Sequence, residues 1–205
     1  MDIKLNFINK TNDANNSEFV IFQKNVATSF DELAVAWKVI KYCGQGDYHP
    51  FVFPMTMEVG ANDCYDNYMP EIPAENGNMY CVELTSSGHR LLPCGRGTSA
   101  KEVQVRNDLQ RGAVNANIYK DGKLLATKTG IAPQQKAVFE FKPTIWIGAV
   151  SQVVEGKVMN SAIMSDVNTE ISLLGIASAD IVATGGGPGC NSSVIAFSLE
   201  NVVMA

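Results

Sequence analysis

Residues 102–141 read EVQVRNDLQRGAVNANIYKDGKLLATKTGIAPQQKAVFEF, with alternating apolar and polar segments on each side of the turn Lys120-Asp121-Gly122-Lys123. Asp-Gly between such segments is the strongest short-range signal of a β-hairpin, because glycine accepts the positive φ of a tight primed turn. This stretch therefore predicts a hairpin and indicates an all-β fold class.

Short strand-like segments of the same kind recur along the chain. Examples are Ile3–Phe7, Phe19–Ile21 and His49–Val59, and two further hairpins are expected from Tyr80–Leu84 with Leu91-Leu92 and from Ala179–Ala183 with Val194–Val203. Many short strands separated by turn residues are typical of a sandwich or a barrel. Since the chain shows no internal repeat and no linker, we expect a single all-β domain over residues 1–205, built as an antiparallel two-sheet β-sandwich.

The segment from Thr28 to Cys43 allows two interpretations. As one short helix near residues 29–42, Ser29 would cap the first turn and Glu32 would complete a capping box. As a strand, the segment would place Leu33, Val35, Trp37 and Val39 on one face. Its β-branched and aromatic content, together with its all-β surroundings, favours the strand.

Prolines mark two further features of the first half. Pro50 and Pro54 interrupt the strand pattern of His49–Val59, so this element is expected at a sheet edge or with a bulge. Pro70 and Pro73 fall in Asn62–Asn78, the longest stretch without clear periodicity. Long irregular loops in compact domains often carry function, and we expect the binding surface there.

Composition excludes some classes of protein. The 205 residues carry a net charge of −5, so a nucleic-acid partner is not expected. The charge is uneven: residues 47–87 hold seven acidic and no basic residues, and residues 101–142 hold eight basic and four acidic ones. Such asymmetry suits either two differently charged solvated faces or head-to-tail contacts between copies.

The N-terminal residues and the cysteines bear on the compartment. Residues 1–7 alternate as in a strand and lack the apolar core of a secretory signal. The five cysteines are odd in number and contain no C-x-x-C pair, which indicates reduced thiols. We therefore expect a cytoplasmic protein without a transmembrane segment, an expectation that leaves room for non-classical export.

The sequence assigns no catalytic, cofactor-binding or metal-binding residue. Gly185–Gly189 lacks the Lys-Ser or Lys-Thr and the helix of a phosphate loop, so a hairpin turn is expected. His49 and His89 are the two histidines, and neither has metal-ligand spacing with a cysteine. No cofactor is expected.

Carboxylates and aromatic residues leave two binding hypotheses open. Asp63, Asp66 and Glu71 would offer Ca²⁺ its preferred oxygen ligands, and Asp13-x-Asn15-x-Ser17 imitates the start of a calcium loop. Solvated acidic loops are the favoured interpretation. Among the aromatic residues, Trp37 and Trp146 lie in apolar runs typical of a core. Tyr65 and Tyr68 are candidates for stacking on a carbohydrate, although packing of the loop against the sheet is the favoured interpretation.

The sequence favours a non-enzymatic protein that acts in self-assembly or binding, with itself as the partner in a homo-oligomer or structural assembly. The apolar end Val202-Val203-Met204-Ala205 is poorly suited to a free tail in water. Two alternatives remain: a lectin-like or membrane-surface binding module, with a carbohydrate or membrane partner, and a hydrolase that uses carboxylates of residues 58–75.

Overall fold

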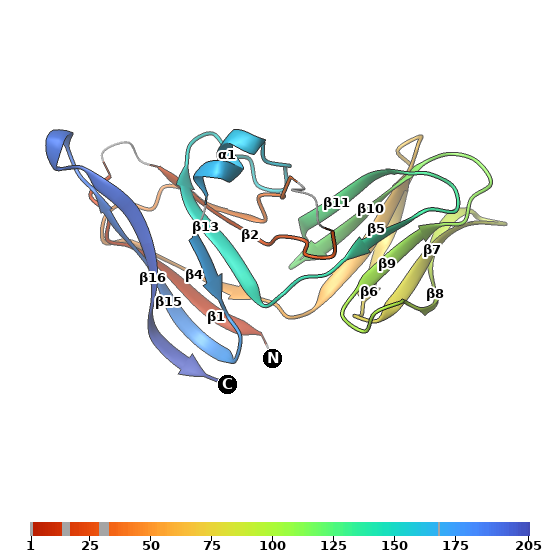
Figure 1. The fold of residues 1–205 in the computed structure, drawn as a ribbon, viewed down its shortest axis with the longest axis horizontal. Coiled ribbons are helices and arrows are strands. Elements are labelled where there is room, and N and C mark those ends of the chain that lie inside the picture. The colour runs from red at the N-terminus through yellow and green to blue at the C-terminus, as the bar shows by residue number, and fades with distance from the viewer. Residues whose placement is uncertain (1, 14–16, 29–32, 168) are drawn as a thin grey trace. The chain divides into compact units, whose positions relative to one another are not determined.

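The computed structural model describes residues 2–13, 17–28, 33–167 and 169–205 (Figure 1). Strands dominate these residues, with one short α-helix, so the all-β class is confirmed. The strands form four four-stranded sheets instead of two. The two-sheet sandwich predicted from the sequence is therefore not confirmed.

Contacts between residues divide the chain into two compact units. Unit 1 comprises Met1–Lys24, Leu33–Met55 and Pro143–Ala205, and unit 2 comprises Asn25–Glu32 and Thr56–Lys142. Prolines lie at two of the points where the chain passes from one unit to the other: Pro54 just before the boundary at residues 55 and 56, and Pro143 directly after the boundary at residues 142 and 143. We predicted that residues 1–205 fold as a single domain. The division into two units does not test whether they fold together, so this stays a prediction.

Unit 1 contains two sheets, a helix and a 3₁₀ turn. The first sheet has the order β16-β15-β1-β4, with bounds Ser193–Met204, Ile176–Gly186, Ile3–Asn9 and Tyr48–Phe53. The second has the order β14-β13-β2-β3, with bounds Thr169–Ser172, Thr144–Val150, Glu18–Phe22 and Lys38–Ile40. Helix α1 spans Ser161–Asp166, and the 3₁₀ turn η1 spans Gly189–Asn191.

Unit 2 contains the other two sheets. The order β11-β10-β5-β6 has bounds Lys123–Ile131, Val114–Lys120, Met57–Asp63 and Tyr68–Ala74. The order β12-β9-β7-β8 has bounds Lys136–Phe139, Val103–Asn107, Asn78–Thr85 and Gly88–Arg96. Tyr80 of β7 links the two sheets, since its hydroxyl donates to the Pro73 carbonyl of β6 at 2.9 Å.

Alternating burial explains why these segments are strands. Along β1 and β10 every second side chain is buried, as expected where one sheet face covers a core. In unit 1, Phe7 of β1 and Phe19 of β2 bring their ring centroids to 4.6 Å, which joins the two sheets. Trp37 is buried edge-on against Phe53, as its apolar surroundings predict.

Two strand pairs depart from the antiparallel arrangement that the sequence predicted. β1 runs parallel to β15, and β7 runs parallel to β9. The first pair joins segments from opposite ends of the sequence, as Figure 1 shows by the red β1 beside the blue β15. Parallel neighbours need a long connection, and a pattern of local hairpins does not reveal them.

The predicted turn at residues 120–123 is confirmed. β10 and β11 pair with Lys120 opposite Lys123, and the two residues between them have positive φ, 55° at Asp121 and 65° at Gly122. Positive φ at both central positions defines the type I′ turn, whose twist matches that of the flanking strands.

We expect Gly122→Val to destabilise the protein by on the order of 1 kcal/mol or more, because a β-branched residue is strained at positive φ. Gly122→Asn is the matched control, since asparagine tolerates this region and should leave stability close to wild type. Chemical denaturation of the three proteins measures the difference. Equal midpoints for the valine and asparagine variants would contradict the turn assignment.

The element predicted over His49–Val59 is two strands in different sheets. Pro54 lies between β4 and β5, and these strands belong to different units. The expected position at a sheet edge is confirmed for β4, which carries Pro50 and has one neighbour, β1. An edge tolerates proline because its missing N–H faces away from the ladder.

The ambiguous segment from Thr28 to Cys43 contains no helix in its described residues, 28 and 33–43. Its strand portion is β3, with Val35 in an isolated bridge to Val158. Ser29 and Glu32, on which the helix interpretation depended, lie outside the described residues. The helix α1 stands instead at Ser161–Asp166, where Asn160 caps it by accepting a hydrogen bond from the Ile163 N–H at 2.8 Å.

The prediction that all five cysteines are reduced is wrong for two of them. Cys81 of β7 and Cys94 of β8 form a disulfide, with Cα atoms 5.7 Å apart. A register shift between Met79 and Tyr80 leaves Cys94 as the extra residue of β8. Cys43, Cys64 and Cys190 are free. Since disulfides are uncommon in reducing compartments, the cysteines no longer support the cytoplasmic expectation, which stays a prediction.

Candidate functional site

The stretch predicted as an irregular loop, Asn62–Asn78, is mostly a second hairpin. β5 ends at Asp63, a short turn follows, and β6 begins at Tyr68. β6 is an edge strand, and this explains why Pro70 and Pro73 fit within it. The loop prediction was therefore wrong, although the turn of this hairpin does line a pocket.

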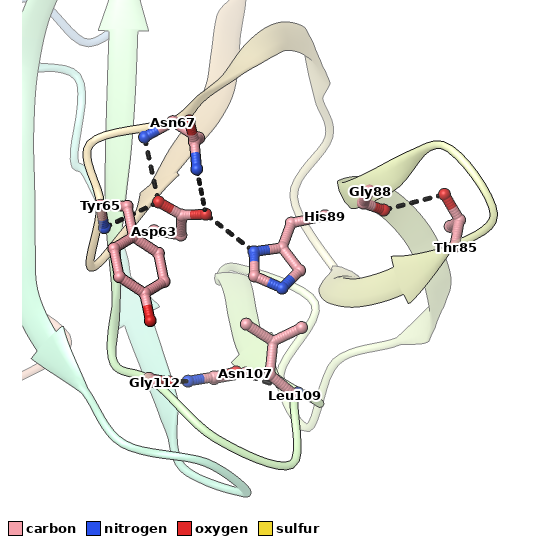
Figure 2. A network of polar contacts seen from close by, with 9 residues as sticks. All are labelled: Asp63, Tyr65, Asn67, Thr85, Gly88, His89, Asn107, Leu109 and Gly112. Carbon is pink, nitrogen blue, oxygen red and sulfur yellow. Dashed lines mark hydrogen bonds and ion pairs between the residues drawn. The ribbon is translucent and has the colours of Figure 1, made fainter.

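Asp63 organises that turn through its carboxylate (Figure 2). The side chain is 1% exposed. Oδ1 accepts the backbone N–H groups of Tyr65 and Asn67 at 2.9 and 3.0 Å. Oδ2 accepts the Asn67 amide at 3.0 Å and contacts Nδ1 of His89 at 2.8 Å. One buried carboxylate thus holds the turn and fixes an imidazole from β8.

The hydrogen bonds to Asp63 decide its charge state. Burial alone raises the pKa of this carboxyl, because a charged group loses hydration. The donors from Asn67, His89 and Tyr65 outweigh burial and lower the pKa to about 2. Asp63 is therefore ionised at neutral pH.

The ionised carboxylate also sets the orientation of His89. A carboxylate only accepts, so Nδ1 of His89 carries the hydrogen in this contact. Figure 2 shows the second ring nitrogen, Nε2, on the side away from Asp63. The His89 side chain is 25% exposed, so this nitrogen is positioned to accept or donate toward solvent.

His89 lies where two surface pockets of unit 2 meet. The first has a volume of about 480 Å³ and includes Asp63, Tyr65, Tyr68, Ser87 and His89 in its wall. The second has a volume of about 620 Å³ and shares Leu84 and His89 with the first.

The second pocket is bounded on its other side by residues 108–111. Asn107 holds this segment, because its buried amide donates to the carbonyls of Gly112 and Ile131 at 2.9 and 2.8 Å. The same side chain accepts the Leu109 N–H at 3.0 Å. Both pockets are thus fixed by a buried polar side chain at a strand end.

The other carboxylates of the predicted acidic loop do not converge on Asp63. Asp66 is exposed, at a φ of 61°, and accepts the Asn62 amide at 3.2 Å. Glu71 lies exposed on β6. Burial raises the pKa of Tyr68, and its hydrogen bond to Glu71 adds to the rise. Glu71 therefore interacts with Tyr68 and not with Asp63.

A different trio of possible metal ligands lies nearby. Atoms of Cys81, Glu83 and Asp108 fall within 4.8 Å of one another. However, the Cys81 sulfur is bonded to Cys94, and the thiolate is the form that binds metal. Arg106 donates to both oxygens of Asp108 at 2.6 and 2.7 Å. Because Cys81 and Asp108 already have these partners, the three residues are not available together to bind a metal ion.

The remaining sequence candidates lie in unit 1. Gly185–Gly189 is part of the β15–β16 hairpin, as predicted, and Gly187 donates its N–H to the Asn12 carbonyl at 2.8 Å. Asp13 accepts the Ser17 N–H at 2.8 Å, while Asn15 lies outside the described residues.

His49 lies exposed on β4. Trp146 is partly buried, stacked on Phe22, with the Lys24 ammonium 3.5 Å from its ring centroid.

The edges of the sheets are a second kind of candidate surface, and β16 differs from the other edge strands. β3, β12 and β14 have three or four residues. β4, β6 and β8 contain proline, and β11 contains two lysines. β16 has twelve residues and contains no Pro, Lys or Arg. Short length, proline, lysine and β-bulges are features that protect an edge from pairing with another chain, and β16 has register shifts on both sides of its regular part, Ala196–Glu200.

No family model, curated protein sequence or solved structure matches this chain. Within the described part of the chain, no helix has the length and apolarity that a membrane span requires. The sequence signals that could have marked the site were Asp63 before a turn and a histidine three residues after Ser86. Neither signal could identify the Asp63–His89 pair, because this pair forms only when the two hairpins meet.

Proposed function

We propose that the protein is a non-enzymatic component of a homo-oligomer or larger assembly, and that β16 pairs with β16 of a second copy. The observation that supports the proposal is the length and composition of this edge strand. Two copies related by a twofold axis would align their β16 strands antiparallel. The first sheet of unit 1 would then continue from one copy into the next.

The regular part of β16 is where pairing would occur. Ala196–Glu200 pairs residue by residue with β15, and β15 lies on one side only. The alternate residues Val194, Ala196 and Ser198 are exposed, whereas Phe197 faces inward with its ring centroid 6.1 Å from that of Phe19. The strand is thus anchored by one face and one edge, and no strand among the described residues pairs with its other edge.

The C-terminal end of β16 is irregular. Asn201, at a φ of 50°, stands at a register shift, so the last residues form a bulged continuation. Met204 pairs with Ile176, and the Ala205 N–H donates to the Gly175 carbonyl at 2.9 Å. The apolar end is therefore tied to its own chain. Its exposed side chains, Val202, Val203 and Met204, would extend an interface that starts at Ala196–Glu200.

We expect Ser198→Lys to weaken self-association by about tenfold, because two lysines would face each other near the twofold axis. Val52→Lys on β4, the opposite edge of the same sheet, is the matched control and should leave association unchanged. Sedimentation or light scattering over a wide concentration range measures both. A wild-type protein that stays monomeric throughout, or equal effects of the two variants, would contradict the proposal.

The hydrolase alternative receives less support from the geometry. A glycosidase needs two carboxyl groups across a cleft, one of them free to attack or to transfer a proton. Asp63 is buried and accepts four hydrogen bonds. The two other candidates, Asp66 and Glu71, are exposed, but Asp66 accepts the Asn62 amide and Glu71 hydrogen bonds with Tyr68. Neither forms a pair with Asp63 across a cleft.

A further inference from the structure

We infer that the pocket between the β5–β6 turn and the β7–β8 turn binds a neutral carbohydrate. The inference concerns unit 2 and is independent of pairing through β16. It depends on three properties of this pocket: exposed aromatic rings, an oriented imidazole, and a carboxylate whose oxygens already accept hydrogen bonds.

Two tyrosines supply the apolar part of the pocket. Tyr65 and Tyr68 are 79% and 51% exposed, and Leu84, beside them in the pocket wall, is 73% exposed. Tyr68 is held in place by its hydroxyl, which hydrogen bonds with Glu71 and Tyr119. A ring fixed in this way loses little conformational entropy when a ligand covers it. The C–H face of a pyranose is a suitable partner for such a ring.

The polar groups of the pocket include a hydroxyl, an imidazole, and a carboxylate that already has hydrogen-bond partners. Nε2 of His89 and the hydroxyl of Ser87 are directional groups that can exchange hydrogen bonds with a sugar hydroxyl. Nδ1 is fixed by Asp63, so Nε2 is oriented before a ligand arrives. Preorganised polar groups among apolar side chains are typical of small-molecule sites.

The charges exclude the competing ligand classes. Among the described residues that line the pocket, none is Lys or Arg, and the one basic side chain in the wall, His89, already contacts Asp63. Asp63 is the carboxylate in the wall, and its oxygens already accept four hydrogen bonds, so a cation finds no open ligand. A neutral, polyhydroxylated molecule matches both the aromatic rings and the directional hydrogen-bonding groups.

A test uses the full-length protein on an array of neutral oligosaccharides that contain glucose, galactose, mannose or N-acetylglucosamine, with sialylated and sulfated glycans beside them. The best neutral glycan is then titrated in solution against wild type, Tyr65→Ala and His89→Ala. We expect each variant to bind about tenfold more weakly. Tyr42→Ala is the matched control, since Tyr42 is 99% exposed but belongs to unit 1.

Because Tyr65 is exposed, its replacement should leave the unfolding transition unchanged, and this separates lost binding from lost folding. Repeating the titration in a Ser198→Lys background removes any contribution from self-association. Binding to acidic glycans alone, no binding to any neutral glycan, or equal affinities for wild type and Tyr65→Ala would overturn the inference.

Discussion

Asp63→Ala is expected to lower the free energy of unfolding by about 3 kcal/mol or more, since hydrogen bonds to a buried charged group are among the strongest in proteins. The replacement leaves the N–H groups of Tyr65 and Asn67 without their acceptor and releases His89. Urea denaturation followed by circular dichroism measures the loss. Asp66→Asn, in the same turn but exposed, is the control and should change stability by less than about 0.5 kcal/mol.

The effect of Asp63 should also depend on pH. Its folded pKa of about 2 lies below the unfolded value of about 4, so its stabilisation is fully present above pH 4. It is lost as the pH falls through the folded pKa. The stability difference between wild type and Asp63→Ala should therefore shrink between pH 4 and pH 2. A difference that stays constant over this range would show that the carboxylate is not held as described.

The second large effect is expected from the disulfide. The double variant Cys81→Ala/Cys94→Ala should lose about 3 kcal/mol, because the bond closes a loop with a sequence separation of 13 residues and restricts the unfolded chain. The loss should appear equally when wild type is unfolded in reducing buffer. Cys190→Ala, which removes an exposed free thiol, is the control and should not change stability.

Thiol counting provides the independent check on the disulfide. Under non-reducing denaturation, three of the five cysteines should react with a thiol reagent, and peptide mapping should join residues 81 and 94. Five reactive thiols would contradict the pairing. They would also restore the argument that the cysteines indicate a reducing compartment.

Local patterns in the sequence were sufficient for part of this fold. Asp121-Gly122 predicted its hairpin because a type I′ turn depends on the two residues at its centre. Ser86-Ser87-Gly88 likewise marked the β7–β8 turn, and alternation in Ile3–Phe7 marked β1. In each case the decisive interaction lies within a few residues of the chain.

The features that sequence reasoning missed depend on contacts between distant segments. Pro70 and Pro73 suggested a loop, but an edge position makes proline compatible with a strand, and only the sheet order shows that position. The pairing of β7 with β8, which places Cys94 near Cys81, is equally invisible in the spacing of the cysteines. The Asp63–His89 contact requires two hairpins to meet, so neither residue identified the other.

The interrupted course of unit 1 along the chain has a consequence for synthesis on the ribosome. β1 is made before most of unit 2, but its parallel neighbour β15 is made after it. Most of unit 2, Thr56–Lys142, emerges in between as one continuous stretch. Nascent chains that have just passed Lys142 should therefore carry a largely formed unit 2 beside an unfinished unit 1. During that interval the apolar side chains of β1 and β2 are the surfaces that a chaperone would meet.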